Sequence, residues 1–491
     1  MKFCSWIACL FLVASCGEGA ESTGGAGVGG GAAGRTEVVV DGGAGGTTGA
    51  AGEPPAPTGA AGSGAAGTNA IVDAGVAGTT GAAGTGAAAG TTGAAGAKAD
   101  AGTPPVGDGG VAMTAGLRIV FPPAGAVSSD TVVVRGTSSL GGAVKVNGVA
   151  ATSTDGFKTF RAAVPLAMSS NTIAVTTDGG ARTEVVVQRF ASDAAITRGG
   201  GDPFSIFRTF GFAIDADQLN AIFCDDIYDG LVRIDLRTGD RSLASASESS
   251  NKGMVGKGFN EIDNPRGVTL DRPGHALVVD GGKLVGIDLT SGDRTLLSGA
   301  GKGGGTAAKL FVAVGWDPAR SRAIALDYEG NALFAIDPTS GDRTLLSGAG
   351  KGSGTGFDSF GPMDLDLAHG RALTTRAYVN PVIAIDLASG NRSILSGDGA
   401  GSGAALAEPY APAVAPALGV VFVWDKSAKK ILSVDLATGA RRVLADAATG
   451  TGAEITGVDR MAFGRDLLFV RASGGLLAVD PVEGNRVVVS K

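Results

Sequence analysis

The sequence predicts an all-β protein, in which a six-bladed β-propeller follows a small β-sandwich and a long disordered tether. Three observations support this fold class. The pattern Asp-x-x-x-Gly-x-Arg first occurs at residues 235–241 and recurs five times before the C-terminus. Short β-branched runs separated by turn residues precede the first copy, and a long stretch of Gly, Ala and Thr precedes those runs. Repeats of this kind are typical of propellers. Alternating short β-branched runs are typical of β-sandwiches, and low-complexity stretches are typical of disordered segments.

Residues 1–15 are interpreted as an export signal. Lys2 supplies a positive charge, and residues 3–14 form an apolar run that is too short for a bilayer, which takes about 20 helical residues. The run ends in Val-Ala-Ser-Cys at 13–16, which is similar to the lipobox of bacterial lipoproteins. This resemblance implies acylation of Cys16, a membrane as partner, and placement at the outer membrane or cell surface, because Gly17 follows the cysteine rather than Asp.

Residues 16–115 are expected to be a flexible tether. They are dominated by Gly, Ala and Thr in units such as Thr-Gly-Ala-Ala-Gly at 58–62, with almost no aromatic residues. Such a composition cannot bury enough apolar surface to offset the entropy of ordering the backbone. A coil of this length has an end-to-end distance of about 50–60 Å, enough to hold a folded part away from a membrane.

Residues 116–192 are expected to form one small β-sandwich. Strand-like, β-branched runs alternate there with Gly, Asn, Asp and Pro, at 131–136, 143–149, 157–164, 171–176 and 183–190. The sequences at 146–149, 157–166 and 171–173 resemble bacterial Ig-like modules such as those appended to glucodextranases. The resemblance implies a spacer or weakly adhesive module without catalytic residues.

Residues 196–491 are expected to form the propeller. The repeated aspartates lie 53, 49, 49, 49 and 45 residues apart, and one four-stranded blade takes about 40–50 residues. Their role is expected to be structural, since six copies of one catalytic acid would make no chemical sense. They are Asp235, Asp288, Asp337, Asp386, Asp435 and Asp480.

The second blade shows the expected layout, with strands at 267–271, 275–280, 283–289 and 294–298. Asp288 and Arg294 flank its last hairpin and are expected to bind the turn backbone and each other. Gly-rich stretches at 253–258, 298–305 and 347–354 are expected to link successive blades. No exchanged strand is evident, so packing between the first and last blades should close the ring, although 195–198 could add to a sheet edge.

The blades resemble propellers of the NHL, streptogramin-lyase and gluconolactonase types over about residues 200–491. The resemblance concerns architecture, because such folds host many functions. Gluconolactonase-type enzymes hold a divalent metal with a Glu, two Asn and an Asp. Asn264, Glu408 and Asp459 are of matching types here, but a second Asn is not evident.

Candidate binding residues lie just ahead of or within the first strand of several blades. These expected channel-mouth residues are Asn264, Arg266, Asp364, Glu408, Asp459 and Arg460. A second set near the ends of the second strands is expected to cap turns, or alternatively to gather around a cation: Asp226, Asp280, Asp327, Arg376, Asp425 and Arg471. The two histidines, His275 and His369, are expected in surface turns on the opposite face, which removes the usual general base of streptogramin-lyase-type propellers.

Composition narrows the function. The 84 glycines and 2 histidines do not fit an ordinary α/β enzyme, and a net charge of −7 without a basic cluster argues against nucleic acid as a partner. Cys224 is the single cysteine after residue 16, which excludes a disulfide framework.

The sequence therefore favours a lipid-anchored, non-catalytic binding or scaffold protein with a protein or glycan partner. The alternative is a metal-dependent hydrolase or lactonase that works in the propeller channel. The sequence assigns no cofactor. The alternative is a calcium or another divalent ion, either structural or bound in the channel.

Overall fold

The computed structural model describes residues 116–201, 209–356, 360–376 and 380–491. Within these ranges the chain is all-β, with strands β1 to β32 and four 3-10 helices of three residues each. No helix in the described ranges is long and apolar enough to cross a membrane. The expected export signal, Cys16 and the expected tether at 16–115 lie outside the described residues.

Strands β1 to β8 form the N-terminal module. They are β1 (Leu117–Phe121), β2 (Gly125–Val127), β3 (Thr131–Ser138), β4 (Val144–Val146), β5 (Val149–Ala150), β6 (Thr159–Pro165), β7 (Ser169–Thr177) and β8 (Arg182–Arg189). β1, β3 and β6 make a three-stranded sheet, while β2, β8, β7, β4 and β5 belong to a larger one. Alternate residues of β3 and β8 are buried, as expected for strands with one face on a core.

One run of the N-terminal module differs from its expected single strand. Residues 143–149 are divided between β4 and β5, which pair as a hairpin with Val146 opposite Val149. The turn residues between them, Asn147 and Gly148, have φ angles of 49° and 81°. Asn-Gly is the favoured pair for a two-residue hairpin with both residues in the left-handed region, so the local sequence itself ends the strand.

The remaining strands form six groups of four consecutive strands, numbered 1 to 6 in chain order. Group 1 has β9 (Thr209–Asp215), β10 (Asn220–Asp225), β11 (Gly230–Asp235) and β12 (Arg241–Ala246). Group 2 has β13 (Pro265–Arg272), β14 (His275–Asp280), β15 (Lys283–Asp288) and β16 (Arg294–Ser298). Group 3 has β17 (Phe311–Asp317), β18 (Arg322–Asp327), β19 (Ala332–Ile336) and β20 (Arg343–Ser347).

The second half of the series repeats this layout. Group 4 has β21 (Phe360–Asp366), β22 (Arg371–Arg376), β23 (Val382–Asp386) and β24 (Arg392–Ser396). Group 5 has β25 (Pro409–Ala415), β26 (Val420–Asp425), β27 (Lys430–Asp435) and β28 (Arg441–Ala445). Group 6 has β29 (Arg460–Gly464), β30 (Leu467–Ala472), β31 (Gly475–Val479) and β32 (Arg486–Ser490).

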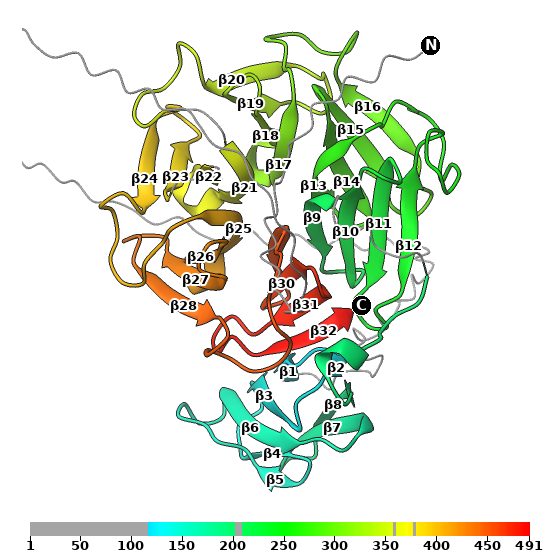
Figure 1. Ribbon diagram of the computed structural model, residues 1–491, viewed down its shortest axis with the longest axis vertical. Helices are drawn as coiled ribbons and strands as arrows, with labels where there is room; N and C mark the ends of the chain where they lie inside the picture. The colour runs from blue at the N-terminus through cyan, green and yellow to red at the C-terminus, as the bar shows by residue number, and fades with distance from the viewer. Residues whose placement is uncertain (1–115, 202–208, 357–359, 377–379) are drawn as a thin grey trace, which may run out of the picture. The chain divides into compact units, whose positions relative to one another are not determined.

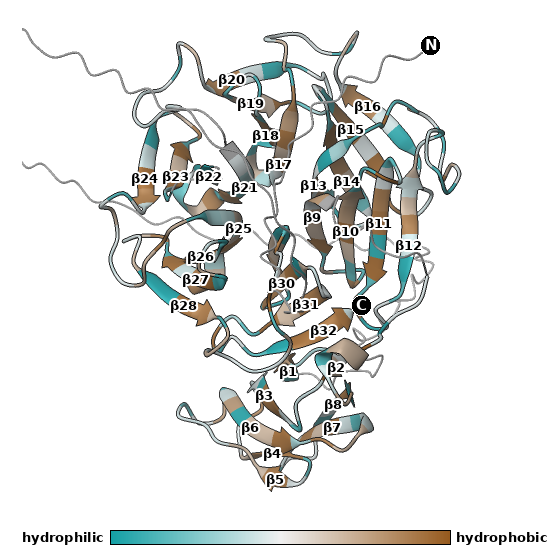
Figure 2. Cartoon of the chain, in the orientation of Figure 1, coloured by the Kyte–Doolittle hydropathy of each residue, from teal (hydrophilic) through white to brown (hydrophobic). Residues whose placement is uncertain are grey.

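Each group is an antiparallel meander, and the arrangement of the groups is propeller-like. The first strand of each group, called the inner strand below, contacts the inner strands of the groups before and after it, and β29 contacts β9. Figure 1 shows the groups following one another around a common centre. Hydrophobic residues concentrate on the strands, and the connecting loops are more hydrophilic (Figure 2).

Adjacent groups are tied together by the arginine of the Asp-x-x-x-Gly-x-Arg repeat. Nη1 of Arg343 donates to Oγ of Ser298, the last residue of β16, at 2.9 Å. That Oγ donates in turn to the carbonyl of Gly341, at 2.6 Å. The same three-residue contact joins groups 1 and 2, 3 and 4, and 4 and 5. The arginine thus binds the preceding group, which corrects the expectation that Asp288 and Arg294 bind each other.

The first and last groups make this same contact. Nη1 of Arg241 donates to Oγ of Ser490 at 2.9 Å, and this Oγ donates to the carbonyl of Gly239 at 2.6 Å. Beside this contact, the backbones of Arg198 and Lys491 exchange hydrogen bonds of 3.3 and 2.9 Å. Arg198 therefore adds to the edge of group 6. All four strands of groups 1 and 6 are consecutive, so the ring closes without strand exchange.

The rest of the repeat shapes its own turn and holds the linker that enters the group. Oδ1 of Asp288 accepts hydrogen bonds of 2.8 Å from the backbone N–H groups of Thr290 and Ser291. In the next group, Oδ1 of Asp342 accepts a bond of 2.6 Å from Gly304 in the incoming linker. Gly303 lies so close that a Cβ there would meet the carbonyl of Gly341 at 1.9 Å. The Gly-rich stretches are therefore fitted to the turns they cross.

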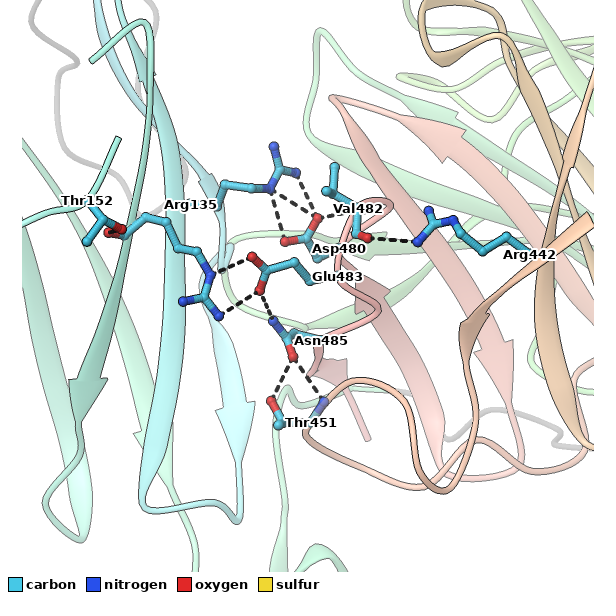
Figure 3. A network of polar contacts seen from close by, with 9 residues as sticks. Arg135, Thr152, Arg442, Thr451, Asp480, Val482, Glu483 and Asn485 are labelled. Carbon is cyan, nitrogen blue, oxygen red and sulfur yellow. Dashed lines mark hydrogen bonds and ion pairs between the residues drawn. The ribbon is translucent and has the colours of Figure 1, made fainter. Parts of the chain in front are cut away.

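The N-terminal module contacts group 6 through its backbone and its charges. Ala126 in β2 pairs with Val488 in β32, so β2 connects group 6 to β8 in a nine-stranded sheet. Nε of Arg135 donates to both carboxylate oxygens of Asp480 at 3.1 and 3.0 Å, and Figure 3 shows the two side chains facing each other. Glu483, two residues before Asn485, accepts from Arg161. One repeat aspartate therefore carries an additional contact with the module.

Candidate functional site

A cavity of about 420 Å³ lies between the inner strands of the groups and is called the channel below. Gly, Ala, Val, Leu, Phe and Met supply most of its lining. Among the described lining residues three carry a formal charge: Arg266, Asp364 and Arg460. Arg266 and Arg460 are at the beginnings of β13 and β29, so both lie at the end of the channel where the inner strands start. This end is called the mouth.

Phe210 brings the two arginines together. It is the second residue of β9, the inner strand that contacts both β13 and β29. The guanidinium of Arg266 lies over its ring, with the Cζ atom 4.8 Å from the ring centroid. Its backbone carbonyl accepts a hydrogen bond from Nε of Arg460. One aromatic residue therefore orients one guanidinium by a cation–π contact and the other by a hydrogen bond.

Arg460 is held further by its neighbours. Its Nη1 donates to the hydroxyl of Tyr410 and to the backbone carbonyl of Asp459, both at 2.7 Å. Nε of Arg266, in contrast, is buried and has no hydrogen-bond partner among the residues that the structure describes. At the mouth, the guanidinium of Arg460 is therefore fixed by hydrogen bonds, whereas that of Arg266 contacts the face of the Phe210 ring.

Asp364 lies deeper in the channel and is engaged with the backbone. One carboxylate oxygen accepts from the N–H of Leu365 at 2.8 Å, and the other accepts from Val414 in β25 at 2.7 Å. Burial raises the pKa of Asp364 to about 6, against the lowering effect of these two bonds. Its carboxyl therefore ties β21 to β25, and its charge varies near neutral pH.

The other expected mouth residues lie in the linkers and outside the described lining of the channel. The backbone N–H of Asn264 donates to Asp280, and that of Glu408 donates to Asp425. Burial raises the pKa of Asp459, and the charges of Arg471, Arg460 and Lys426 oppose this rise. The structure thus places Arg266, Asp364 and Arg460 on the channel wall, and places Asn264, Glu408 and Asp459 directly before the inner strands β13, β25 and β29.

The carboxylates at the ends of the second strands hold the incoming linkers. Asp327 accepts from the N–H groups of Lys309 and Leu310 at 2.8 and 3.0 Å. Asp280 and Asp425 make the corresponding bonds in groups 2 and 5. In group 1 the last residue of the second strand is Asp225, and Asp226 follows it directly, near the strand end as expected. Burial raises the pKa values of Asp225 and Asp280.

In groups 4 and 6 the residue paired with the first residue of the inner strand is an arginine, Arg376 or Arg471. Arg471 is fully buried, and its burial lowers the pKa of the guanidinium, while the charges of Asp459 and Asp225 raise it. The charges of these two carboxylates partly balance the buried cation at this position.

Both histidines lie at the other end of the channel, near the turns between first and second strands. Nδ1 of His275 lies 2.5 Å from Oδ1 of Asp271, and Nδ1 of His369 lies 2.8 Å from Oδ2 of Asp366. Neither histidine lines the described channel. In the described part of the chain, no group of three or more His, Cys, Asp and Glu side chains is placed to hold a metal ion.

Phe210 is the functional residue that the sequence analysis missed. Its ring and carbonyl act together only because β13 and β29 flank β9, and these strands are far apart in sequence. A usable signal was its position at the start of an inner strand, the same place that singled out Arg266 and Arg460. The described geometry allows the mouth to bind a ligand through two guanidiniums, and provides no nucleophile paired with a base.

The topology and the channel define an all-β protein with a propeller-like fold and a central cavity. No protein-family model matches the chain, and no curated protein matches it.

Similar solved structures include an auxiliary nutrient binding protein from Bacteroides ovatus ATCC 8483. It is 13% identical, with 72% of this chain and 94% of that chain covered and a TM-score of 0.42. Another, an auxiliary nutrient binding protein from Bacteroides thetaiotaomicron VPI-5482, is 12% identical, with 73% and 96% covered and a TM-score of 0.41.

Proposed function

We propose that this chain is a lipid-anchored protein of the cell envelope, in which a six-bladed β-propeller acts as a non-catalytic binding module. The six groups of strands are its blades, at 196–491. In this proposal β1 to β8 are an Ig-like sandwich at 116–192, and residues 16–115 are a disordered tether to the lipid on Cys16. The observation that carries the binding role is the channel, whose mouth holds Arg266 and Arg460 against Phe210.

The chemistry of the channel supports binding rather than turnover. General acid–base catalysis needs a titratable group within hydrogen-bond reach of the reacting atom. Asp364 is the described acid on the channel wall, and both of its oxygens accept backbone hydrogen bonds. The residue types that favoured a lactonase, Asn264, Glu408 and Asp459, belong to linkers, where two of them hold their positions through backbone bonds to strand-end carboxylates.

The face around the mouth supports a protein or glycan as the partner. Three lysines lie over aromatic rings there: Lys252 over Tyr228, Lys283 over Phe259 and Lys426 over Tyr410, at 5.7, 5.3 and 4.4 Å from the ring centroids. Tyr328 and Met254 are exposed in the linkers and turns of the same face. Amphipathic aromatic residues beside charges are typical of binding surfaces.

The experiment that tests this function combines a binding assay with a turnover assay. The purified chain should bind members of a glycan or protein panel saturably, and should not hydrolyse a simple aldonolactone. Its thermal midpoint should be insensitive to millimolar calcium, zinc or chelator, since a bound ion would raise it by mass action. Lactone turnover that is lost on Glu408→Ala or Asp459→Ala would contradict the proposal and favour the metal-dependent hydrolase.

The anchor has a separate test. Replacing Cys16 with Ser removes the thiol that would be acylated, so the protein should move from the membrane fraction to the soluble envelope fraction or the medium. Unchanged partitioning of Cys16→Ser into membranes would contradict the lipid anchor and would leave the binding role of the propeller untouched.

A further inference from the structure

We propose that the mouth of the channel is an oxyanion site, which takes the carboxylate or phosphate group of a small ligand between Arg266 and Arg460. This inference rests on the proposed binding role of the channel and names the chemical class of its ligand. It is argued from the charge of the wall, the placement of the guanidiniums and the size of the cavity.

The charge of the channel wall favours an anion. The protein as a whole carries a formal charge of −7, yet the described lining has two arginines and one aspartate. The two oxygens of Asp364 are already engaged with the N–H groups of Leu365 and Val414. With Asp364 ionised, the described lining keeps one positive charge in excess, and Asp459, which interacts with Arg460 from just outside the lining, offsets part of it. The low-dielectric wall strengthens the attraction of the remaining positive charge for an anion.

The positions of the two arginines do not follow the repeat. The inner strands begin with the pairs Thr209–Phe210, Pro265–Arg266, Phe311–Val312, Phe360–Gly361, Pro409–Tyr410 and Arg460–Met461. Only two of these six starts contain arginine, and those two flank Phe210. An arginine that served the architecture would be expected in most groups, as the arginine of the repeat turn is. Arg460 is paired with Arg471, whereas Arg266 follows the residue paired with Asp280, so the two arginines reach the mouth from different positions of the repeat.

The guanidiniums keep donors available for a ligand. Arg266 is positioned by the ring of Phe210, which consumes none of its N–H groups, and its buried Nε has no hydrogen-bond partner in the described part of the chain. A guanidinium offers parallel N–H groups that match the two oxygens of a carboxylate or phosphate. Fixing Arg460 through Phe210 and Tyr410 in advance lowers the entropy lost on binding.

The cavity suits a small molecule. Its volume of about 420 Å³ is within the range of small-ligand sites, about 300–1,000 Å³. Below the mouth the wall is formed largely by apolar side chains such as Phe212, Val268 and Val314. We therefore expect the anionic group to lie at the mouth and the remainder of the ligand to extend toward this wall.

The test is a calorimetric titration of the purified full chain with three probes: glucuronate, glucose and inorganic phosphate. Glucuronate and glucose differ in whether C6 is a carboxylate or a hydroxymethyl group, so their comparison isolates the oxyanion. We expect glucuronate or phosphate to bind at least ten times more tightly than glucose, and added salt to weaken this binding. The stronger of the two anions identifies whether the natural ligand carries a carboxylate or a phosphate.

Variants assign the binding to the mouth. Arg266→Gln should weaken binding of the preferred anion at least tenfold, and Arg266→Lys should weaken it less, because lysine keeps the charge and loses the planar fork. Arg272→Gln is the matched control, since Arg272 lies at the other end of β13, is largely exposed and pairs with Asp271. It should bind the anion as the wild type does. The thermal midpoint of each variant without ligand shows that it is folded.

Three results would overturn the proposal: no binding of either anion, equal binding of glucose and glucuronate, or unchanged binding in both Arg266 variants. Equal binding of the two sugars would leave the proposed binding role standing while removing its oxyanion specificity. Lactone turnover together with Arg266-dependent anion binding would contradict the non-catalytic role while leaving the oxyanion site standing. The two proposals therefore fail in different ways.

Discussion

The repeat turns at the outer side of the groups and the mouth of the channel use arginine in opposite ways. In the turns the arginine recurs in every group and is bonded to a serine of the preceding group or, in group 6, to backbone carbonyls of the incoming linker. At the mouth it occurs in two groups and lies against one phenylalanine. Residues that follow the repeat therefore build the ring, and residues that depart from the repeat are the candidates for binding.

The largest effect is expected from the most deeply buried repeat arginine. Arg294 is 3% exposed, and its guanidinium has six hydrogen-bond acceptors: Ser245, Ala246, Val255, Phe259, Asn260 and Gly292. Arg294→Ala leaves these buried acceptors without a donor, and should lower the free energy of unfolding by about 3 kcal/mol or more. Urea unfolding measures this change. Arg272→Ala, at an exposed position, should cost about 0.5 kcal/mol or less. Similar losses in the two variants would show that the turns do not build the ring.

Ring closure is tested by two matched serines. Ser298 joins groups 2 and 3, and Ser490 joins groups 6 and 1 through the same contact. Ser298→Ala and Ser490→Ala should each lower the free energy of unfolding by about 1–2 kcal/mol, because each leaves a buried carbonyl and a guanidinium short of one partner. A negligible effect of Ser490→Ala beside a clear effect of Ser298→Ala would mean that the ring is not closed by this contact.

A smaller effect is expected where a structural carboxylate supports the mouth. Asp280 accepts from the N–H groups of Asp263 and Asn264, which lead directly to Arg266. Asp280→Ala should cost about 1 kcal/mol, with no dependence on added calcium or zinc, and should weaken anion binding only slightly. Thermal unfolding with and without metal measures this. A metal-dependent midpoint that disappears in Asp280→Ala would assign the carboxylate to a cation site instead.

The pH dependence of stability distinguishes the acids of the two regions. Bonds from the turn backbone lower the pKa of Asp288, so its stabilisation is present above the ordinary Asp pKa and is lost as the pH falls below it. Burial raises the pKa of Asp364 to about 6, so the folded state retains a proton that the unfolded state has lost, and stability should fall as the pH rises from about 4 to about 6.

Asp364→Asn removes the channel titration while keeping an oxygen that can accept a backbone hydrogen bond. The fall in the thermal midpoint between about pH 4 and pH 6 should therefore become shallower in this variant, and Asp288→Asn should leave that interval unchanged. An Asp364→Asn profile parallel to that of the wild type would show that the carboxyl is ionised in the folded protein throughout the interval.

The sequence was sufficient for much of the fold because the repeat sets both spacing and turn chemistry. The expected bounds of β14 and β16 match the structure, and the Gly-rich stretches lie between successive groups as expected. The contact of Arg343 with Ser298 was not predictable, since it joins residues 45 apart that meet only once the groups are packed. Residues bonded within their own turn can be recognised from local pattern, whereas those bonded across groups cannot.

The same limit applies to the mouth. Arg266 and Arg460 are strand residues that face the channel, while Asn264, Glu408 and Asp459 belong to the linkers just before the strands. A shift of one residue decides which side a strand residue faces, and sequence spacing does not fix where an inner strand begins. Phe210 was marked only by its position near the start of an inner strand, because its role depends on two neighbours from groups 2 and 6.

The central claim is that the mouth of the channel, and not the repeated turns, carries the binding function. A crystal soaked with glucuronate tests this most directly. The account predicts the carboxylate within hydrogen-bond distance of the guanidinium of Arg266, at about 2.7–2.9 Å, with the sugar extending into the channel. Glucuronate bound at the repeat turns or the linkers, with the two arginines of the mouth uninvolved, would contradict it.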